Sequence, residues 1–215
     1  MFSRAPRLAC NAIQIQRRYM TSFYSYFPKT LPEGAPPKGK FELDTRALRN
    51  EFLRLQSQYH PDKLRQLTEE QRQGMTLEEL EQRSADLNKA YKALCDPLQR
   101  AIHILQNRGI DVDEEKKGED DISAGPPKGV EDMEALMEIM EVHEAIEEAT
   151  EQSQIDSLKE ENGKRIEASI KDLTSAFASD DLEKAKAATI LLRYWSNIHN
   201  ALDQWVVGKF NPVNH

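Results

Sequence analysis

Apolar side chains recur at the spacing of an α-helix over much of this chain. The first such stretch covers residues 45–60, and one face of the expected helix is lined by Leu48, Phe52, Leu55 and Tyr59. Pro61 follows directly. Because proline lacks a backbone N–H and disfavours helical geometry in the residue before it, the pattern predicts that the helix ends there.

A second helix is predicted to begin at Thr76. Thr76 and Glu79 have the spacing of a capping box, in which each side chain accepts a hydrogen bond from the other residue's backbone N–H. This helix should reach Cys95, and its apolar positions are Leu80, Leu87, Tyr91 and Leu94. Pro97 suits the first turn of a short third helix, and Gly109 stands where a C-terminal cap is expected.

Three longer helical stretches follow, at about 130–150, 153–178 and 180–207. Because short connections join them, an antiparallel bundle is favoured. Asn162 and Gly163 weaken the middle stretch, since glycine costs roughly 1 kcal/mol in a helix interior, so any bend is expected there. Strand-like alternation persists nowhere, and the chain is therefore predicted to be all-α.

The stretch at 130–150 carries two apolar faces where a bundle helix needs one. Ala135, Ile139, Val142 and Ile146 run along its full length and suit a core. The second face lies roughly 140° away and occupies only the N-terminal half. Its members are Met133, Leu136, Met137 and Met140, rimmed by Glu141 and Glu144. It is either an exposed protein-binding surface or a face packed against a neighbouring segment, and periodicity alone leaves both open.

The N-terminal segment differs from the rest in composition. Residues 1–20 hold four arginines, and the first acidic residue of the chain is Glu33. Such a segment is typical of a mitochondrial transit peptide, with a disordered basic arm as the alternative. Loss of four positive charges would take the formal net charge from −8 to −12, so binding to nucleic acid through bulk charge is not expected.

Composition argues against several other classes. Cys10 and Cys95 are the only cysteines, so neither a disulfide framework nor a CxxC metal clip is expected. His143 and His199 have no partners at metal-ligand spacing. No apolar run approaches the ~20 residues that a membrane span needs. The sequence holds no phosphate loop or nucleophile constellation, so we expect neither an enzyme nor a bound cofactor.

The tripeptide His60-Pro61-Asp62 stands at the end of the first predicted helix. Pro61 frees its two neighbours from helical pairing, so both can offer hydrogen-bonding groups to a partner. As an alternative, they merely cap the helix. The helix before them is basic, a polar loop follows, and the next helix contains LNKAYKALCDPLQRA.

This combination resembles the J-domain of DnaJ-type co-chaperones. The matching positions are Tyr59, His60, Pro61, Asp62 and Lys63, then Asn88, Ala90, Tyr91, Leu94, Asp96 and Pro97. The resemblance implies that the tripeptide docks on an ATP-bound DnaK-type chaperone and triggers hydrolysis. Exposed guanidinium groups would steer the helix onto an acidic surface, and the candidates are Arg46, Arg49 and Arg54. Many J-domains carry further basic residues where this chain has Leu53 and Gln58, so a different affinity or a different choice of chaperone partner is expected.

The segments FYSYFPKT, LMEIMEVHEAIEEA and LLRYW narrow the resemblance. Together they resemble the HscB family, mitochondrial co-chaperones of iron–sulfur cluster assembly, over residues 23–208. In that family the C-terminal bundle binds the IscU-type scaffold, and the J-domain hands it to the DnaK-type partner. The implied scaffold-contacting residues are Leu136, Met137, Met140, Glu141, Glu144 and Tyr194. Some relatives have an N-terminal zinc-binding cysteine region, which is lacking here, so no metal is predicted.

The expected organisation is an N-terminal J-domain, made of a helical hairpin plus short helices, followed by a C-terminal three-helix bundle. The boundaries are 1–20 for the transit peptide, 21–109 for the J-domain, 110–129 for an acidic and Pro/Gly-rich linker, 130–208 for the client-binding bundle and 209–215 for a tail. The expected function is a non-catalytic co-chaperone in the mitochondrial matrix, with no nucleic-acid or membrane partner. The alternatives are a J-protein with another client, one that recruits the chaperone to a fixed site, or an inactive structural subunit.

Overall fold

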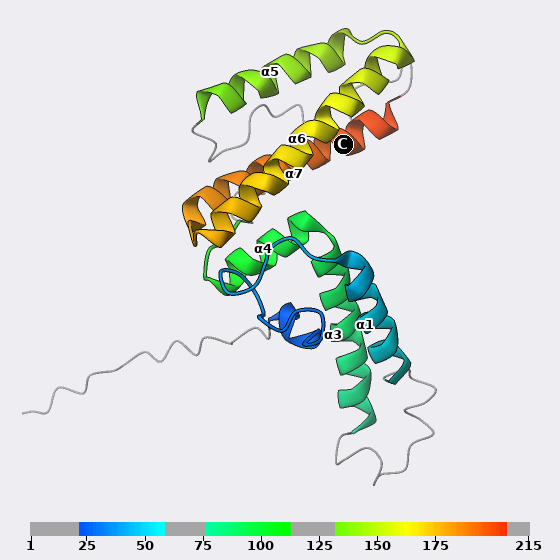
Figure 1. The fold of residues 1–215 in the computed structure, drawn as a ribbon. Coiled ribbons are helices and arrows are strands. Elements are labelled where there is room, and N and C mark those ends of the chain that lie inside the picture. Colours follow the sequence, from blue (N-terminus) through cyan, green and yellow to red (C-terminus); the bar gives the residue numbers. More distant parts are fainter. Residues whose placement is uncertain (1–21, 59–75, 113–131, 206–215) are drawn as a thin grey trace, which may run out of the picture.

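The computed structural model describes residues 22–58, 76–112 and 132–205, and every regular element in them is helical. The elements are the 3-10 helix η1 (Phe23–Tyr26) and the α-helices α1 (Thr45–Gln58), α3 (Leu77–Cys95), α4 (Pro97–Asn107), α5 (Met133–Glu148), α6 (Gln152–Ala178) and α7 (Leu182–Gln204). The predicted all-α class is confirmed. In Figure 1, α1 and α3 lie side by side, α5, α6 and α7 form a second group, and α4 lies between the two groups.

Several predicted segments lie outside the described residues. These are the transit peptide, the tripeptide His60-Pro61-Asp62 with the loop after it, most of the linker, and the C-terminal tail. Within the described helices, none is long and apolar enough to span a membrane.

Local chemistry sets the ends of α3 and α4 as predicted. The Thr76 hydroxyl accepts from the Glu79 backbone N–H at 3.2 Å, and the Glu79 carboxylate accepts from the Thr76 N–H at 2.8 Å, which completes the capping box. Pro97 occupies the first turn of α4. Gly109 follows this helix with a φ of 80°, a left-handed conformation that glycine adopts without steric cost.

A buried carboxylate fixes the N-terminal segment onto α1. Glu51 is only 5% exposed, and its two carboxylate oxygens accept from the backbone N–H groups of Lys29 at 3.1 Å and Thr30 at 2.7 Å. Because a buried charge is costly unless hydrogen-bonded, these two donors explain why an acidic residue is tolerated on the inner face of the helix.

A buried imidazole on α4 fixes η1 in place. The Nε2 atom of His103 accepts from the Phe23 backbone N–H at 3.0 Å and lies 2.9 Å from the Asn107 side-chain nitrogen. The Phe23 ring stacks on the imidazole with centroids 3.8 Å apart. Burial lowers the pKa of His103 from its usual 6.5 to about 4, and Lys89 contributes in the same direction.

Helix α6 continues unbroken through Asn162 and Gly163, where the sequence predicts any bend to lie. Asn162 is fully buried there, and its side-chain nitrogen donates to the Trp195 carbonyl of α7 at 2.9 Å. Gly163 has open space around the position of a Cβ atom. Helix α6 packs along α7, and this tertiary contact outweighs the local weakness of these two residues.

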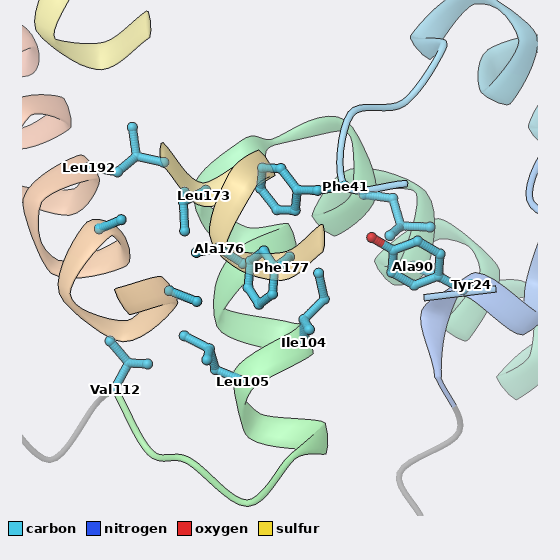
Figure 2. Packing of buried hydrophobic residues seen from close by; sticks show 14 of the residues in the cluster. Tyr24, Phe41, Ala90, Ile104, Leu105, Val112, Leu173, Ala176, Phe177 and Leu192 are labelled. Carbon is cyan, nitrogen blue, oxygen red and sulfur yellow. The ribbon is translucent and has the colours of Figure 1, made fainter. Parts of the chain in front are cut away.

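One hydrophobic core runs through both groups of helices (Figure 2). Phe177 of α6 is 2% exposed and stacks on Phe41, which precedes α1, with ring centroids 5.1 Å apart. The same cluster contains Leu105 of α4 and Leu192 of α7. Arg100 of α4 donates to the Phe41 carbonyl at 2.7 Å. The N-terminal and C-terminal helices therefore share a core and are not joined by a tether alone.

The start of the predicted linker belongs to this core as well. Val112 is fully buried, and its carbonyl accepts from Arg193 of α7 at 3.2 Å. Ile110 is half-buried and packs against the same cluster. Residues 110–112 are therefore not the flexible linker expected there, because Ile110 and Val112 pack in the core beside α7.

Acidification should destabilise the fold through His103. Its pKa is lower in the folded than in the unfolded protein, so the unfolded chain takes up the proton first and the free energy of unfolding falls as pH drops from about 6.5 to about 4. The loss amounts to at most about 3 kcal/mol. Urea unfolding across this pH range should show a shallower pH dependence for His103→Gln than for the unchanged chain. Parallel profiles would contradict this role.

Candidate functional site

Helix α5 is attached to the bundle by its first predicted apolar face. Ile139, Val142 and Ile146 are all 3% exposed or less. They share a core cluster with Ile155 of α6 and with residues of α7. The predicted core face of this helix is confirmed at these three positions, while Ala135 is half-buried and packs against the larger core.

Two polar contacts add to this attachment. The Arg165 Nε atom of α6 donates to the Glu138 carboxylate of α5 at 2.7 Å, and the guanidinium lies 5.5 Å from the Trp195 ring centroid. Tyr194 of α7 and Nε2 of His143 are hydrogen-bonded to each other. Burial lowers the pKa of His143 and raises that of Tyr194, which favours the neutral form of both groups.

The second apolar face of α5 is mostly open to solvent. Met133, Met137 and Met140 are 70%, 58% and 63% exposed, and we call these three residues the methionine face. Only one other large apolar side chain in the described ranges is comparably exposed. Leu136 differs, since it is half-buried and packs against the larger core. The interpretation as an exposed surface therefore holds for the three methionines, and the interpretation as a packed face holds for Leu136.

The acidic rim is also present. Glu141 and Glu144 are exposed on the same helix. The methionine face is therefore an adaptable apolar strip beside negative charge, a combination suited to a protein partner with an apolar contact region and basic surroundings.

Tyr194, which the family resemblance implies as a scaffold-contacting residue, is not part of this exposed face. Its side chain is 5% exposed, with the ring edge-on to Trp195 at 5.3 Å and the hydroxyl held by His143. Helix α7 contacts both α6 and α4, so four consecutive residues are buried around its circumference, namely Leu192, Arg193, Tyr194 and Trp195. Tyr194, which lies about 100° around the helix from Trp195, is therefore still inside the protein.

The basic face of α1 is the second candidate surface. Arg46, Arg49 and Arg54 are all exposed, as predicted for a surface that steers a partner. Arg54 lies 3.9 Å from the Glu51 carboxylate, which offsets part of its charge. Leu53 is 49% exposed and shares a face with Arg46 and Arg49 at helical spacing. In the sequence, Leu53 stands out only as an apolar residue where many J-domains have a basic one. Its exposure in the structure makes it a candidate contact residue.

No metal site accompanies either surface in the part of the chain that the structure covers. No group of three or more His, Cys, Asp and Glu side chains is placed there to hold an ion. His143 is engaged with Tyr194, and His199 lies 3.6 Å from the Asp203 carboxylate.

Comparison with known proteins is consistent with this arrangement of helices. Residues 131–203 match the family described as the HSCB C-terminal oligomerisation domain. The chain is 35% identical to the mitochondrial J-type co-chaperone jac1 of Schizosaccharomyces pombe, over 84% of this chain and 72% of that protein. It is 30% identical to the human iron–sulfur cluster co-chaperone protein HscB, over 75% of this chain and 62% of that protein. The solved structure of the Jac1 co-chaperone from Saccharomyces cerevisiae superimposes with a TM-score of 0.66 at 28% identity, covering 91% of this chain and 99% of that one.

The shared helical fold and these similarities define the protein class as a co-chaperone. The chain belongs to the HscB family of J-type co-chaperones.

Replacement of Tyr194 tests whether it is structural. Tyr194→Phe removes the hydroxyl but keeps the buried ring, so the free energy of unfolding should fall by only about 0.5–1.5 kcal/mol. Tyr194→Ala leaves a cavity under α5 and should cost roughly 3–5 kcal/mol. Urea denaturation followed by circular dichroism measures both. A loss below about 1 kcal/mol for the alanine variant would show that the ring is not packed as described.

Proposed function

We propose that this chain is a mitochondrial J-protein that stimulates the ATPase of a DnaK-type chaperone and delivers an IscU-type iron–sulfur scaffold protein to it. The observation that carries the proposal is the methionine face, which is left uncovered on a helix anchored by its other sides. Two relatives, the mitochondrial co-chaperone jac1 and the human iron–sulfur cluster co-chaperone HscB, support the choice of compartment and client.

The client contact is assigned to α5. Met137 and Met140 offer flexible, polarisable side chains, and Leu136 borders them at the edge of the core. Burial of an exposed side chain of this kind against a partner contributes ~1.5–3 kcal/mol before the cost of association is subtracted. Glu141 and Glu144 would favour a client with basic residues around its apolar contact. Tyr194 supports this surface from beneath, through His143.

The chaperone contact is assigned to α1 and to the tripeptide that follows it in sequence. Arg46 and Arg49 give the exposed face of α1 a positive charge that attracts an acidic partner surface, mainly by raising the association rate. His60 and Asp62 would then engage the ATP-bound chaperone, in keeping with the J-domain resemblance. The tripeptide itself lies outside the described residues.

The proposed mechanism uses binding alone. One end of the chain captures the scaffold and the other engages the chaperone, which raises the effective concentration of the scaffold at the chaperone's substrate site. Hydrolysis occurs in the chaperone and tightens its grip on the delivered client. Figure 1 shows α1 and α5 in different parts of the molecule, so both partners can bind together.

The chain organisation forms part of the same proposal. Residues 1–20 would direct import into the matrix and then be removed, residues 21–109 would engage the chaperone, and residues 130–208 would hold the client.

His60→Gln tests the chaperone end. The variant keeps a polar side chain but lacks the imidazole, so stimulation of the chaperone's ATPase should disappear while scaffold binding is retained. Single-turnover ATP hydrolysis and a scaffold pull-down measure the two properties separately. Retention of full stimulation would remove the central claim.

Simultaneous replacement of Met133, Met137 and Met140 by Ala tests the client end, because all three side chains are exposed and contribute little to the core. Removal of three apolar contacts should weaken scaffold binding by several kcal/mol, at ~1.5–3 per side chain, without loss of ATPase stimulation. Leu53→Ala is the matched control, because it also removes an exposed apolar side chain but lies on α1. Titration calorimetry that gives the same affinity for the triple variant as for the control would refute the assignment.

A further inference from the structure

Methionine is unusually concentrated on one face of this protein. Three of the six methionines of the chain fall between residues 133 and 140. Their spacing of four and three residues places successive thioethers next to one another along the helix. These three are the only methionines in the described ranges, and all are more than half exposed.

An exposed thioether is chemically different from a leucine of similar size. Either side chain can supply apolar contact, but only methionine can be oxidised to its sulfoxide, which is polar and chiral. Sulfoxide formation on the methionine face would replace apolar contact area by strongly hydrated S=O groups. It would leave the fold intact, because these side chains contribute little to the core.

We propose that the methionine face is a reversible oxidation site that switches client binding off under peroxide stress. This inference rests on the proposed client-binding role of α5. In the forward step a sulfur lone pair attacks one oxygen of a hydroperoxide, the O–O bond breaks, an S=O bond forms and the peroxide is reduced to water or an alcohol. In the reverse step methionine sulfoxide reductases return the sulfur to the thioether, and two thiols become a disulfide as the oxygen leaves as water.

The surroundings favour a neutral oxidant. Glu134, Glu141 and Glu144 are exposed on the same helix, and they would repel an anionic oxidant more than hydrogen peroxide. Bound scaffold would shield the thioethers. Because linkage is reciprocal, a modification that weakens client binding should itself be less favourable on the client-bound protein.

The test measures scaffold affinity of the full chain before and after hydrogen peroxide, with the oxidant removed by catalase. Scaffold binding by the untreated protein is measured first. If it is absent, the proposed function is overturned together with this inference. After treatment we expect the affinity to fall about tenfold or more. Dithiothreitol alone should not restore it, since thiols reverse oxidation at Cys95 but not at methionine. Addition of the A and B reductases, one for each sulfoxide epimer, should restore it to within about twofold.

Matched variants separate the methionine face from other sites. Replacement of Met133, Met137 and Met140 by Leu keeps the apolar face, so this variant should bind scaffold before and after peroxide alike. Met75→Leu should remain as peroxide-sensitive as the unchanged chain. Peptide mass spectrometry should find sulfoxide at the three positions, and less of it when scaffold is present. Oxidation of the three methionines to sulfoxide without loss of scaffold affinity would overturn the proposal. Peroxide sensitivity of the triple-leucine variant equal to that of the unchanged chain would also overturn it.

An unchanged melting temperature after treatment is also expected. A large fall would mean that oxidation acts by unfolding the protein, which would contradict a switch confined to the surface.

Discussion

The packing of Phe177 against Phe41 joins the two groups of helices into one body. Phe177 comes from the C-terminal end of α6, and Phe41 comes from the segment before α1. Arg100 lies over the Phe41 ring at 5.2 Å and also binds the Phe41 carbonyl, so the position of this ring is fixed from two directions. An ion pair between Arg108 and Asp180, at 2.7 Å, links the same regions at the surface. The orientation of α1 relative to α5 therefore follows from core packing.

This shared core explains how a small protein can keep two surfaces uncovered. Helix α5 is held by apolar packing, by the Arg165–Glu138 ion pair and by the bond between Tyr194 and His143. With those contacts in place, the methionine face is not needed for stability and remains available to a partner. The surface that the proposal assigns to the client is thus also the surface on which chemical modification would be tolerated by the fold.

Local signals in the sequence predicted the helices well, because caps and breaks depend on neighbouring residues. Thr76 with Glu79, Pro97 and Gly109 each marked a boundary that the structure confirms. Contacts between distant residues left no such signal. Periodicity could not predict the hydrogen bonds from the backbone of residues 29 and 30 to Glu51. It also could not predict the hydrogen bond between His143 and Tyr194, which are 51 positions apart. For the same reason the pattern revealed a second face on α5 but not its exposure, and it gave no sign that Tyr194 is buried.

The central claim is that one chain couples client capture to ATP hydrolysis by another protein. The most direct measurement is single-turnover hydrolysis by a mitochondrial DnaK-type chaperone with this chain alone, with the scaffold alone and with both together. The account predicts that the rate with both greatly exceeds what their separate effects would give, because the chain delivers the scaffold to the chaperone that it activates. A rate that is merely the combination of independent effects, or no stimulation by the chain, would contradict it.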